Sequence, residues 1–352
     1  MKQLLLNTEA KNKNMVFEPL SIHMLLSLVA AGSNGPTKNQ LLTFLQSKST
    51  QELNYLASTL VPLFFAKEAP NGEPILSFAN GAWIDKSLPV NPSFKWFVDN
   101  AYRTALNQVD FKGKPDEVGM EVNSWAEMET NGRIKDILAR GSVDSQTRLI
   151  LANALYFKGD WEANFDASRT KERDFHFLNG SSVKTPFMTS GGRRYISVFE
   201  SFKVLRLTYK QGQDHENCFS MYVFLPNERY GLSSLVERFS SEFGFLDRHL
   251  PHETVEVRAF LMPKFKFSST FEASELLKTL GLELHFVHGG LTEMDSTEAA
   301  AVTVGRILKT SVWRRHVKRI DFLADHPFIF VIREETTGSV LFIGQVLNPI
   351  AN

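Results

Sequence analysis

The segment Asp295–Arg319 constrains the fold more than any other part of this sequence. It begins with small residues, becomes basic towards its end, and contains one glycine and no proline. Two dense apolar stretches follow it, Phe322–Arg333 and Ser339–Leu347, and both are predicted strands. A connection longer than about 12–15 residues is uncommon in a compact domain unless it is functional or disordered. Because Ala, Val, Ile and Leu argue against disorder, the segment is predicted to be either a functional loop or a strand.

The composition excludes several classes of protein. The chain has 39 Lys and Arg against 39 Asp and Glu, so no net charge favours nucleic acid or a membrane surface. No apolar run is long enough to cross a bilayer, and Leu4–Leu6 is too short for the core of a signal peptide. The single cysteine, Cys218, excludes an internal disulfide and is expected to be a buried, inert thiol at the start of a strand.

Apolar periodicity predicts helices early in the chain and strands late, which favours a mixed α+β fold over βαβ repeats. Helices are expected from Ser21 to the glycine at 32 and at Asn39–Gln46, Thr50–Phe65, Pro92–Tyr102, Pro115–Glu129 and Glu272–Leu280. Further strands are expected at Leu76–Asp85, Ala105–Phe111, Thr147–Lys158, Asp174–Phe177, Lys203–Tyr209, Phe219–Leu225 and, as two strands around Pro263, Val255–Phe267. Thr147–Lys158 is almost continuously apolar and is expected to be buried on both faces. We find no linker and predict a single domain over residues 1–352.

The sequence shows no enzyme, metal or cofactor motif. The nine histidines are scattered, none at a metal-site spacing, and no nucleophile elbow or phosphate-binding glycine loop is present. The basic cluster Trp313–Arg319 suits a nucleic-acid patch, although such a cluster on a neutral protein is more often a solvated loop. Lys309 and the arginines also suit the specificity pocket of a trypsin-like protease.

Four stretches of the chain closely resemble the serpin family, and their sequences are most similar to those of its plant members. They are Phe17–Thr37, Glu121–Leu138, Leu149–Phe165 and Asp325–Pro349. The resemblance implies one monomeric domain of three β-sheets with surrounding helices, in the extracellular space or the cytosol. It also implies a reactive loop at about 295–319. A target protease, serine or cysteine in type, cuts this loop, which then inserts into the main sheet.

The resemblance also implies which residues are functional. The hinge motif corresponds to Thr297, Glu298, Ala299, Ala300, Ala301, Val302 and Thr303. Alternate positions from Thr297 carry small side chains on one face, which could enter a packed sheet. Counting on from the hinge places the cleaved bond at Thr310–Ser311, with Lys309 as the alternative. A sheet-opening cluster corresponds to Ser21, Asn153 and Trp161.

The chain departs from the family pattern in three places. Gly289–Met294 runs directly into Asp295, so the central strand that normally precedes the hinge is absent, together with a histidine that would join Ser21 and Asn153. Glu18 stands where the family has a further serine of that cluster, and a buried carboxylate is costly unless paired. Most of the family's first helix is also missing.

The missing strand leads to a hypothesis about the structure of Asp295–Arg319. Thr297–Leu308 would span about 40 Å as a strand, at about 3.3 Å per residue, and we expect it to replace the absent strand. Lys309–Arg319 would then remain outside as a short basic loop. A loop already used as a strand cannot insert after cleavage, so protease trapping is expected to be impaired. The alternatives are a non-inhibitory serpin that binds a partner through loop 309–319, and a degenerate copy of the gene.

Overall fold

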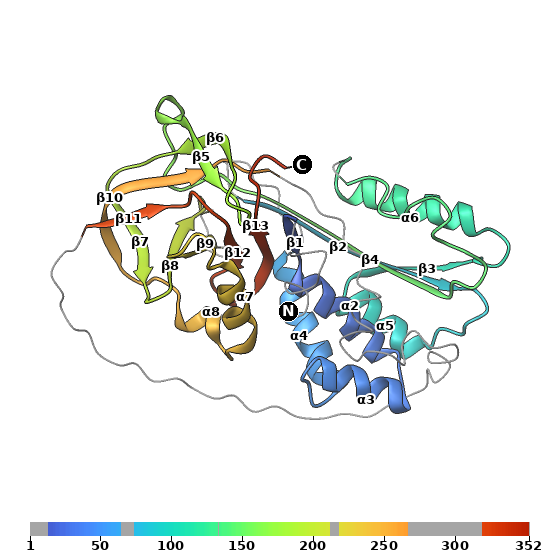
Figure 1. Cartoon of the computed structure of the whole chain (residues 1–352). Helices are drawn as coiled ribbons and strands as arrows, with labels where there is room; N and C mark the ends of the chain where they lie inside the picture. The colour runs from blue at the N-terminus through green and yellow to red at the C-terminus, as the bar shows by residue number, and fades with distance from the viewer. Residues whose placement is uncertain (1–12, 65–73, 133, 212–217, 267–318, 352) are drawn as a thin grey trace.

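The computed structural model describes residues 13–64, 74–132, 134–211, 218–266 and 319–351 (Figure 1). The hinge Thr297–Thr303, the bond Thr310–Ser311 with Lys309, and the helix predicted at Glu272–Leu280 lie outside these residues. Their predictions therefore stay predictions.

A three-stranded sheet forms one half of the fold, with strand order β3 (Thr104–Val109), β2 (Ile75–Asp85) and β4 (Leu149–Lys158). β2 is parallel to β3 and antiparallel to β4, and the β2–β4 ladder runs from the pair Ile75–Lys158 to the pair Ile84–Leu149. Helix α6 (Pro115–Glu129) lies over one face of this sheet, whereas α2 (Pro19–Ala31) and α5 (Pro92–Asn100) lie on the opposite side (Figure 1).

Helix α6 (Pro115–Glu129) has the bounds predicted from the sequence and docks on β2 through two tryptophans. Its buried face includes Trp125, whose ring meets that of Trp83 edge to face at 5.2 Å. Trp83 Nε1 also donates a hydrogen bond to Glu121 at 2.9 Å, which satisfies the one polar atom of that ring. The two rings fill the space above Gly81, where an added Cβ would lie 2.4 Å from Trp83 Cη2.

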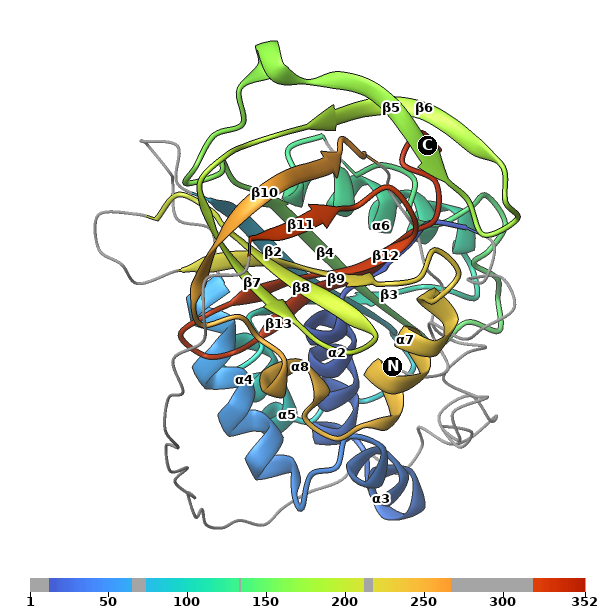
Figure 2. The same ribbon diagram turned by 60° about the vertical axis from the view of Figure 1, so that its left-hand side comes forward.

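A ten-stranded sheet forms the other half of the fold (Figure 2). Its order is β1 (Met15–Phe17), β13 (Val340–Val346), β12 (Phe328–Glu334), β9 (Phe219–Pro226), β8 (Phe202–Thr208), β7 (Arg193–Val198), β10 (Thr254–Pro263), β6 (Ser182–Met188) and β5 (Lys171–His176), with β11 (Ile320–Leu323) parallel to β10. The family resemblance implied three sheets. The described strands form two hydrogen-bonded networks because β10 pairs at Thr254–Glu256 with β7 and at Met262–Pro263 with β6, joining them.

β9 is the centre of the core, and all eight of its residues are buried. Because strand side chains alternate, Met221 and Val223 join the main hydrophobic cluster. Tyr222 and Phe224 face the opposite way and pack with the buried side of α7 (Leu232–Ser241). The continuous apolar sequence of β9 is thus explained by burial on both faces.

The amino-terminal helices are α2 (Pro19–Ala31), α3 (Gly35–Phe44) and α4 (Thr50–Phe64). The start predicted for α3, at Asn39 with Thr37 as the cap, is wrong: the helix begins at Gly35 and Thr37 is buried within it. Pro36 occupies its first turn, where a proline needs no amide donor and has a suitable φ. A proline taken as a stop signal is here part of a helix start.

Three further differences concern strands. Phe322–Arg333, predicted as one strand, is divided between β11 and β12, because His326 is buried beside Pro327 and proline cannot donate to a ladder. Val255–Phe267, predicted as two strands, contains one described strand that ends at Pro263. Sequence periodicity also missed β6 and β7, whose residues alternate between exposed and buried environments and include several charges.

Candidate functional site

The candidate site is the outer edge of β4. One edge of this strand pairs with β2 over ten residue pairs, and no other strand in the described part of the chain pairs with its second edge. The prediction that β4 is buried on both faces is wrong for most of its length. Ala152 and Leu155 are buried, whereas Ile150 and Leu151 are half-buried. An apolar sequence does not ensure burial at a sheet edge, because such a strand has a neighbour on one side only.

Asn153 lies in the middle of β4. Its Nδ2 donates to the carbonyl of Ala79 at 3.1 Å and to Asn80 Oδ1 at 2.8 Å. Its Oδ1 is buried and has no hydrogen-bond partner among the described residues. Such an acceptor loses its water without compensation, so a donor supplied from beyond the β4 edge would complete the site.

Asn80 extends the polar contacts of Asn153 into the fold. Asn80 Nδ2 donates to the carbonyl of Tyr102 at 3.3 Å, and the Tyr102 hydroxyl donates to Asn54 Oδ1 at 2.9 Å. Burial raises the pKa of the Tyr102 hydroxyl, which keeps it protonated as a donor. A buried chain of side chains therefore connects β4, through β2, to helix α4. Asn80 and Tyr102 were not predicted as site residues. For Asn80, its position as a polar residue inside the apolar strand at 75–85 could have indicated a buried hydrogen-bonding role.

Ser21, predicted to belong to the same cluster, is used differently. Its side chain is buried near the start of α2, and its Oγ donates to Glu18 Oε2 at 3.1 Å. Burial raises the pKa of the Glu18 carboxyl to about 7, and the bond from Ser21 partly opposes this shift. No hydrogen bond joins Ser21 to Asn153 in the described structure. Ser21 therefore has a local partner in Glu18.

Trp161, the third predicted member, lies just beyond the end of β4. It forms a β-bridge with Tyr209, and the two rings stack at 4.4 Å with an interplanar angle of 18°. Tyr209 also meets Phe157 edge to face at 4.8 Å. These contacts connect the end of β4 to the ten-stranded sheet, because Tyr209 follows β8. The three predicted residues therefore mark the start of α2, the middle of β4 and its end, and they do not share one contact.

Two other predicted features are partly described. Cys218 is half-buried, so the prediction of a buried thiol is wrong in degree; burial and then Glu334 and Glu335 raise the pKa of the thiol, as expected for an unreactive cysteine. Arg319 is the described member of the basic cluster Trp313–Arg319, and it forms an ion pair with Glu256 at 3.3 Å between two exposed side chains. Such a pair contributes little to stability.

The described residues show neither a metal site nor a membrane-spanning helix. They contain no group of three or more His, Cys, Asp or Glu side chains placed to hold a metal ion. Within the same residues, no helix combines the length and the apolar character needed to span a bilayer.

The fold and the open edge of β4 define an α+β protein whose small sheet lacks a described neighbour on one side. A family model described as serpin (serine protease inhibitor) matches residues 2–296 and 286–349. The chain belongs to the serpin family.

The curated relatives include plant serpins. Serpin-ZX of Arabidopsis thaliana is 48% identical, with 98% of this chain and 94% of the relative covered. Another Arabidopsis relative, named "Probable non-inhibitory serpin-Z5", is 44% identical, with 99% of this chain and 82% of the relative covered. A solved structure titled as the native stressed conformation of Arabidopsis AtSerpin1 superposes with a TM-score of 0.88 at 46% identity, covering 99% of this chain and 95% of that one. The predicted α+β serpin fold and the plant-type resemblance are confirmed.

Proposed function

We propose that this serpin is a non-catalytic, suicide-substrate inhibitor of a serine or cysteine endopeptidase, and that its trapping step is impaired. The protease would cleave at Thr310–Ser311, or at Lys309. Thr297–Leu308 would already serve as the strand next to β4. Cleavage would then release the protease instead of carrying it across the sheet, so most encounters would end in a nicked serpin.

The observation that carries this proposal is the incomplete edge of β4. Among the described strands its backbone has a ladder partner on the β2 side only, and Asn153 Oδ1 is buried without a described donor. Both features call for a strand alongside β4, since an unpaired edge and an unsatisfied buried acceptor each cost free energy. We infer that the segment that contains the predicted hinge supplies this strand.

The comparisons support a missing segment before the hinge. The family model aligns as two pieces that overlap at residues 286–296, just before the predicted hinge. The alignment with Serpin-ZX spans 371 positions, although this chain has 352 residues. That relative therefore contains residues for which this chain has no counterpart.

Incubation with proteases tests the proposal. The protein is mixed with trypsin, chymotrypsin and papain, and the products are separated on denaturing gels. We expect cleavage within 309–311 by at least one protease, little covalent complex and no large rise in melting temperature after cleavage. An SDS-resistant complex as the main product, with a large rise in melting temperature, would show an intact trap.

A second candidate function is non-inhibitory binding through the loop 309–319. It is favoured by the relative named as a probable non-inhibitory serpin, which matches nearly all of this chain. This candidate predicts that no protease is inhibited and that replacing Arg314 and Arg315 with alanine weakens capture of an acidic partner. Sequencing the transcript across Met294–Thr297 first would exclude a degenerate or misassembled copy.

A further inference from the structure

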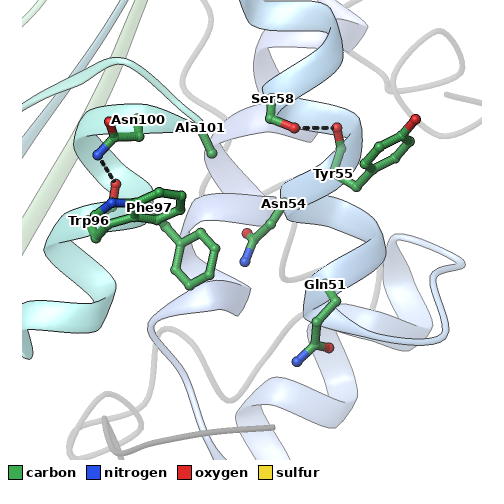
Figure 3. Close-up of a pocket in the computed structure, with 8 residues that line it drawn as sticks. All are labelled: Gln51, Asn54, Tyr55, Ser58, Trp96, Phe97, Asn100 and Ala101. Carbon is green, nitrogen blue, oxygen red and sulfur yellow. Dashed lines mark hydrogen bonds between the residues drawn. The ribbon is translucent and has the colours of Figure 1, made fainter. Parts of the chain in front are cut away.

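A cleft with a volume of about 280 Å³ lies between helices α4 and α5, on a part of the molecule that the proposed inhibition does not use. Its lining includes Asn54 and Tyr55 from α4 and Trp96, Phe97 and Asn100 from α5 (Figure 3). Ligand pockets in proteins are commonly about 300–1,000 Å³, and a cavity of about 150 Å³ already holds benzene. The cleft is therefore large enough for one or two rings.

Aromatic side chains form the walls of this cleft. The Trp96 and Phe97 rings meet edge to face at 5.2 Å, and their planes are nearly perpendicular. Trp96 is 58% exposed and presents apolar surface to solvent beside Phe97, whereas the Tyr55 ring points away from α5 (Figure 3). Exposed aromatic surface gathered around a hollow is typical of a binding site, because a flat ring can cover it and release the water.

Among the polar residues that line the cleft, Asn54 is buried and oriented. Asn54 is almost fully buried, and its Oδ1 is taken by the Tyr102 hydroxyl at 2.9 Å. This bond orients the amide so that Nδ2 is the donor available to a ligand, and Figure 3 shows the Asn54 side chain directed from α4 towards Phe97. Asn100 is anchored in turn by its Nδ2, which donates to the Trp96 carbonyl at 2.8 Å.

The lining residues carry no charge. A charged ligand would therefore lose water on entering the cleft and find no opposite charge, which is unfavourable. A purely apolar ligand would cover the aromatic walls but leave the Asn54 donor unmatched. The lining fits a neutral ring that carries one hydrogen-bond acceptor.

We propose that the α4–α5 cleft is a binding site for a small neutral aromatic molecule, whose ring packs against Trp96 and Phe97 and whose carbonyl accepts from Asn54 Nδ2. The site is independent of the proposed protease inhibition. It forms between two helices of the described fold, and α5 is held in place by an Asn91 cap that accepts from the backbone amide of Ser93 at 2.8 Å.

Calorimetric titration of the full chain with three matched probes tests the ligand class. The probes are acetophenone, which is neutral and has a carbonyl, benzoate, which is an anion of similar shape, and toluene, which has no acceptor. We expect acetophenone to bind with one site per chain and at least roughly tenfold more tightly than either comparison probe. No acetophenone binding at millimolar concentration, or equal binding of benzoate, would overturn the proposal.

Two aromatic variants test the location. Trp96→Ala is expected to weaken acetophenone binding roughly tenfold, because one wall of the cleft is lost. Phe243→Ala is the matched control, since Phe243 is 96% exposed and does not line the cleft. If Trp96→Ala unfolds the protein, Trp96→Leu replaces it with the same expected direction. Unchanged affinity in both cleft variants, or equal loss in Phe243→Ala, would place binding elsewhere and contradict the assignment.

Discussion

Asn153 on β4 donates from Nδ2 to Oδ1 of Asn80 on β2 at 2.8 Å, so two adjacent strands of the small sheet are joined by side chains as well as by their ladder. The two residues are also direct partners in the strand register. Asn80 is buried, and its Nδ2 donates to the carbonyl of Tyr102. This bond connects β2 to the segment between α5 and β3. These buried polar contacts lie next to the sheet edge where the proposed function needs a strand.

Asn80→Ala should lower the free energy of unfolding by about 1–3 kcal/mol, because it removes an acceptor from Asn153 and leaves buried polar atoms unsatisfied. Urea unfolding followed by circular dichroism measures the change. Asn179→Ala is the control, since Asn179 is exposed and bonds only within its own turn. Equal stability of the two variants would show that the Asn80 contacts contribute nothing net.

Glu18 should make stability depend on pH near neutrality. Burial raises the pKa of its carboxyl from 4.5 to about 7 in the folded protein, so the folded state holds a proton that the unfolded state has released. Its contribution is therefore fully present below pH 4.5 and is lost as the pH rises to about 7. By linkage, at about 1.4 kcal/mol per pKa unit, the loss approaches about 3 kcal/mol above pH 7.

Glu18→Gln tests this relation because glutamine cannot titrate. The difference in unfolding free energy between Glu18→Gln and the parent protein should grow between pH 5 and pH 8, in favour of the variant. The measurement is a urea titration at several pH values. A difference that stays constant over this range would contradict the assigned pKa.

Gly81→Ala should destabilise the contact between α6 and the sheet. An added Cβ at Gly81 would lie 2.4 Å from the fully buried ring of Trp83, and Trp125 blocks the ring from moving. Overpacking of this kind typically costs about 1–3 kcal/mol. Thermal unfolding should show a lower melting temperature.

Gly119→Ala is the matched control on α6. The added Cβ would meet Val143 Cγ2 at an ordinary 3.6 Å, and alanine is favoured over glycine inside a helix by up to about 1 kcal/mol. The two glycine variants should therefore shift the melting temperature in opposite directions. A shift of the same sign would contradict the packing argument.

His326→Ala should weaken the junction between β11 and β12. The buried imidazole bonds through Nδ1 to Asp325 at 2.8 Å and through Nε2 to the Pro226 carbonyl at 2.9 Å, so its loss removes both contacts and leaves a cavity. The expected cost is about 2–4 kcal/mol. His252→Ala, at an exposed position, should change the unfolding midpoint little.

Elements were predicted correctly where their structure depends on residues that are close together in the chain. The bounds of α6 were predicted because Pro115, two early acidic residues and a repeating apolar face act within a few turns of one helix. β9 was predicted because its apolar residues are adjacent in the chain. The failures at β11–β12 and β10 arose where a proline or a partner strand far away in sequence decides where a strand ends.

The candidate site was only partly predictable for the same reason. Family resemblance identified Ser21, Asn153 and Trp161, but it did not show that Ser21 bonds to Glu18, that Asn153 bonds to Asn80, or that Trp161 stacks on Tyr209. These partners are mostly distant in sequence, and their contacts depend on strand register. Asn80 and Tyr102 could not be identified as links without knowing that β2 lies between β4 and β3.

By itself, the sequence determined the fold class, the family and the apparent loss of a strand before the hinge, because motif wording and apolar periodicity are properties of the linear chain. Only the tertiary structure decided that much of β4 is half-buried, that one of its edges and an acceptor on Asn153 have no partner among the described residues, and that an uncharged aromatic cleft lies between α4 and α5. The physical reason is that burial, hydrogen-bond satisfaction and cavities depend on which surfaces meet, and those surfaces come from segments far apart in the chain.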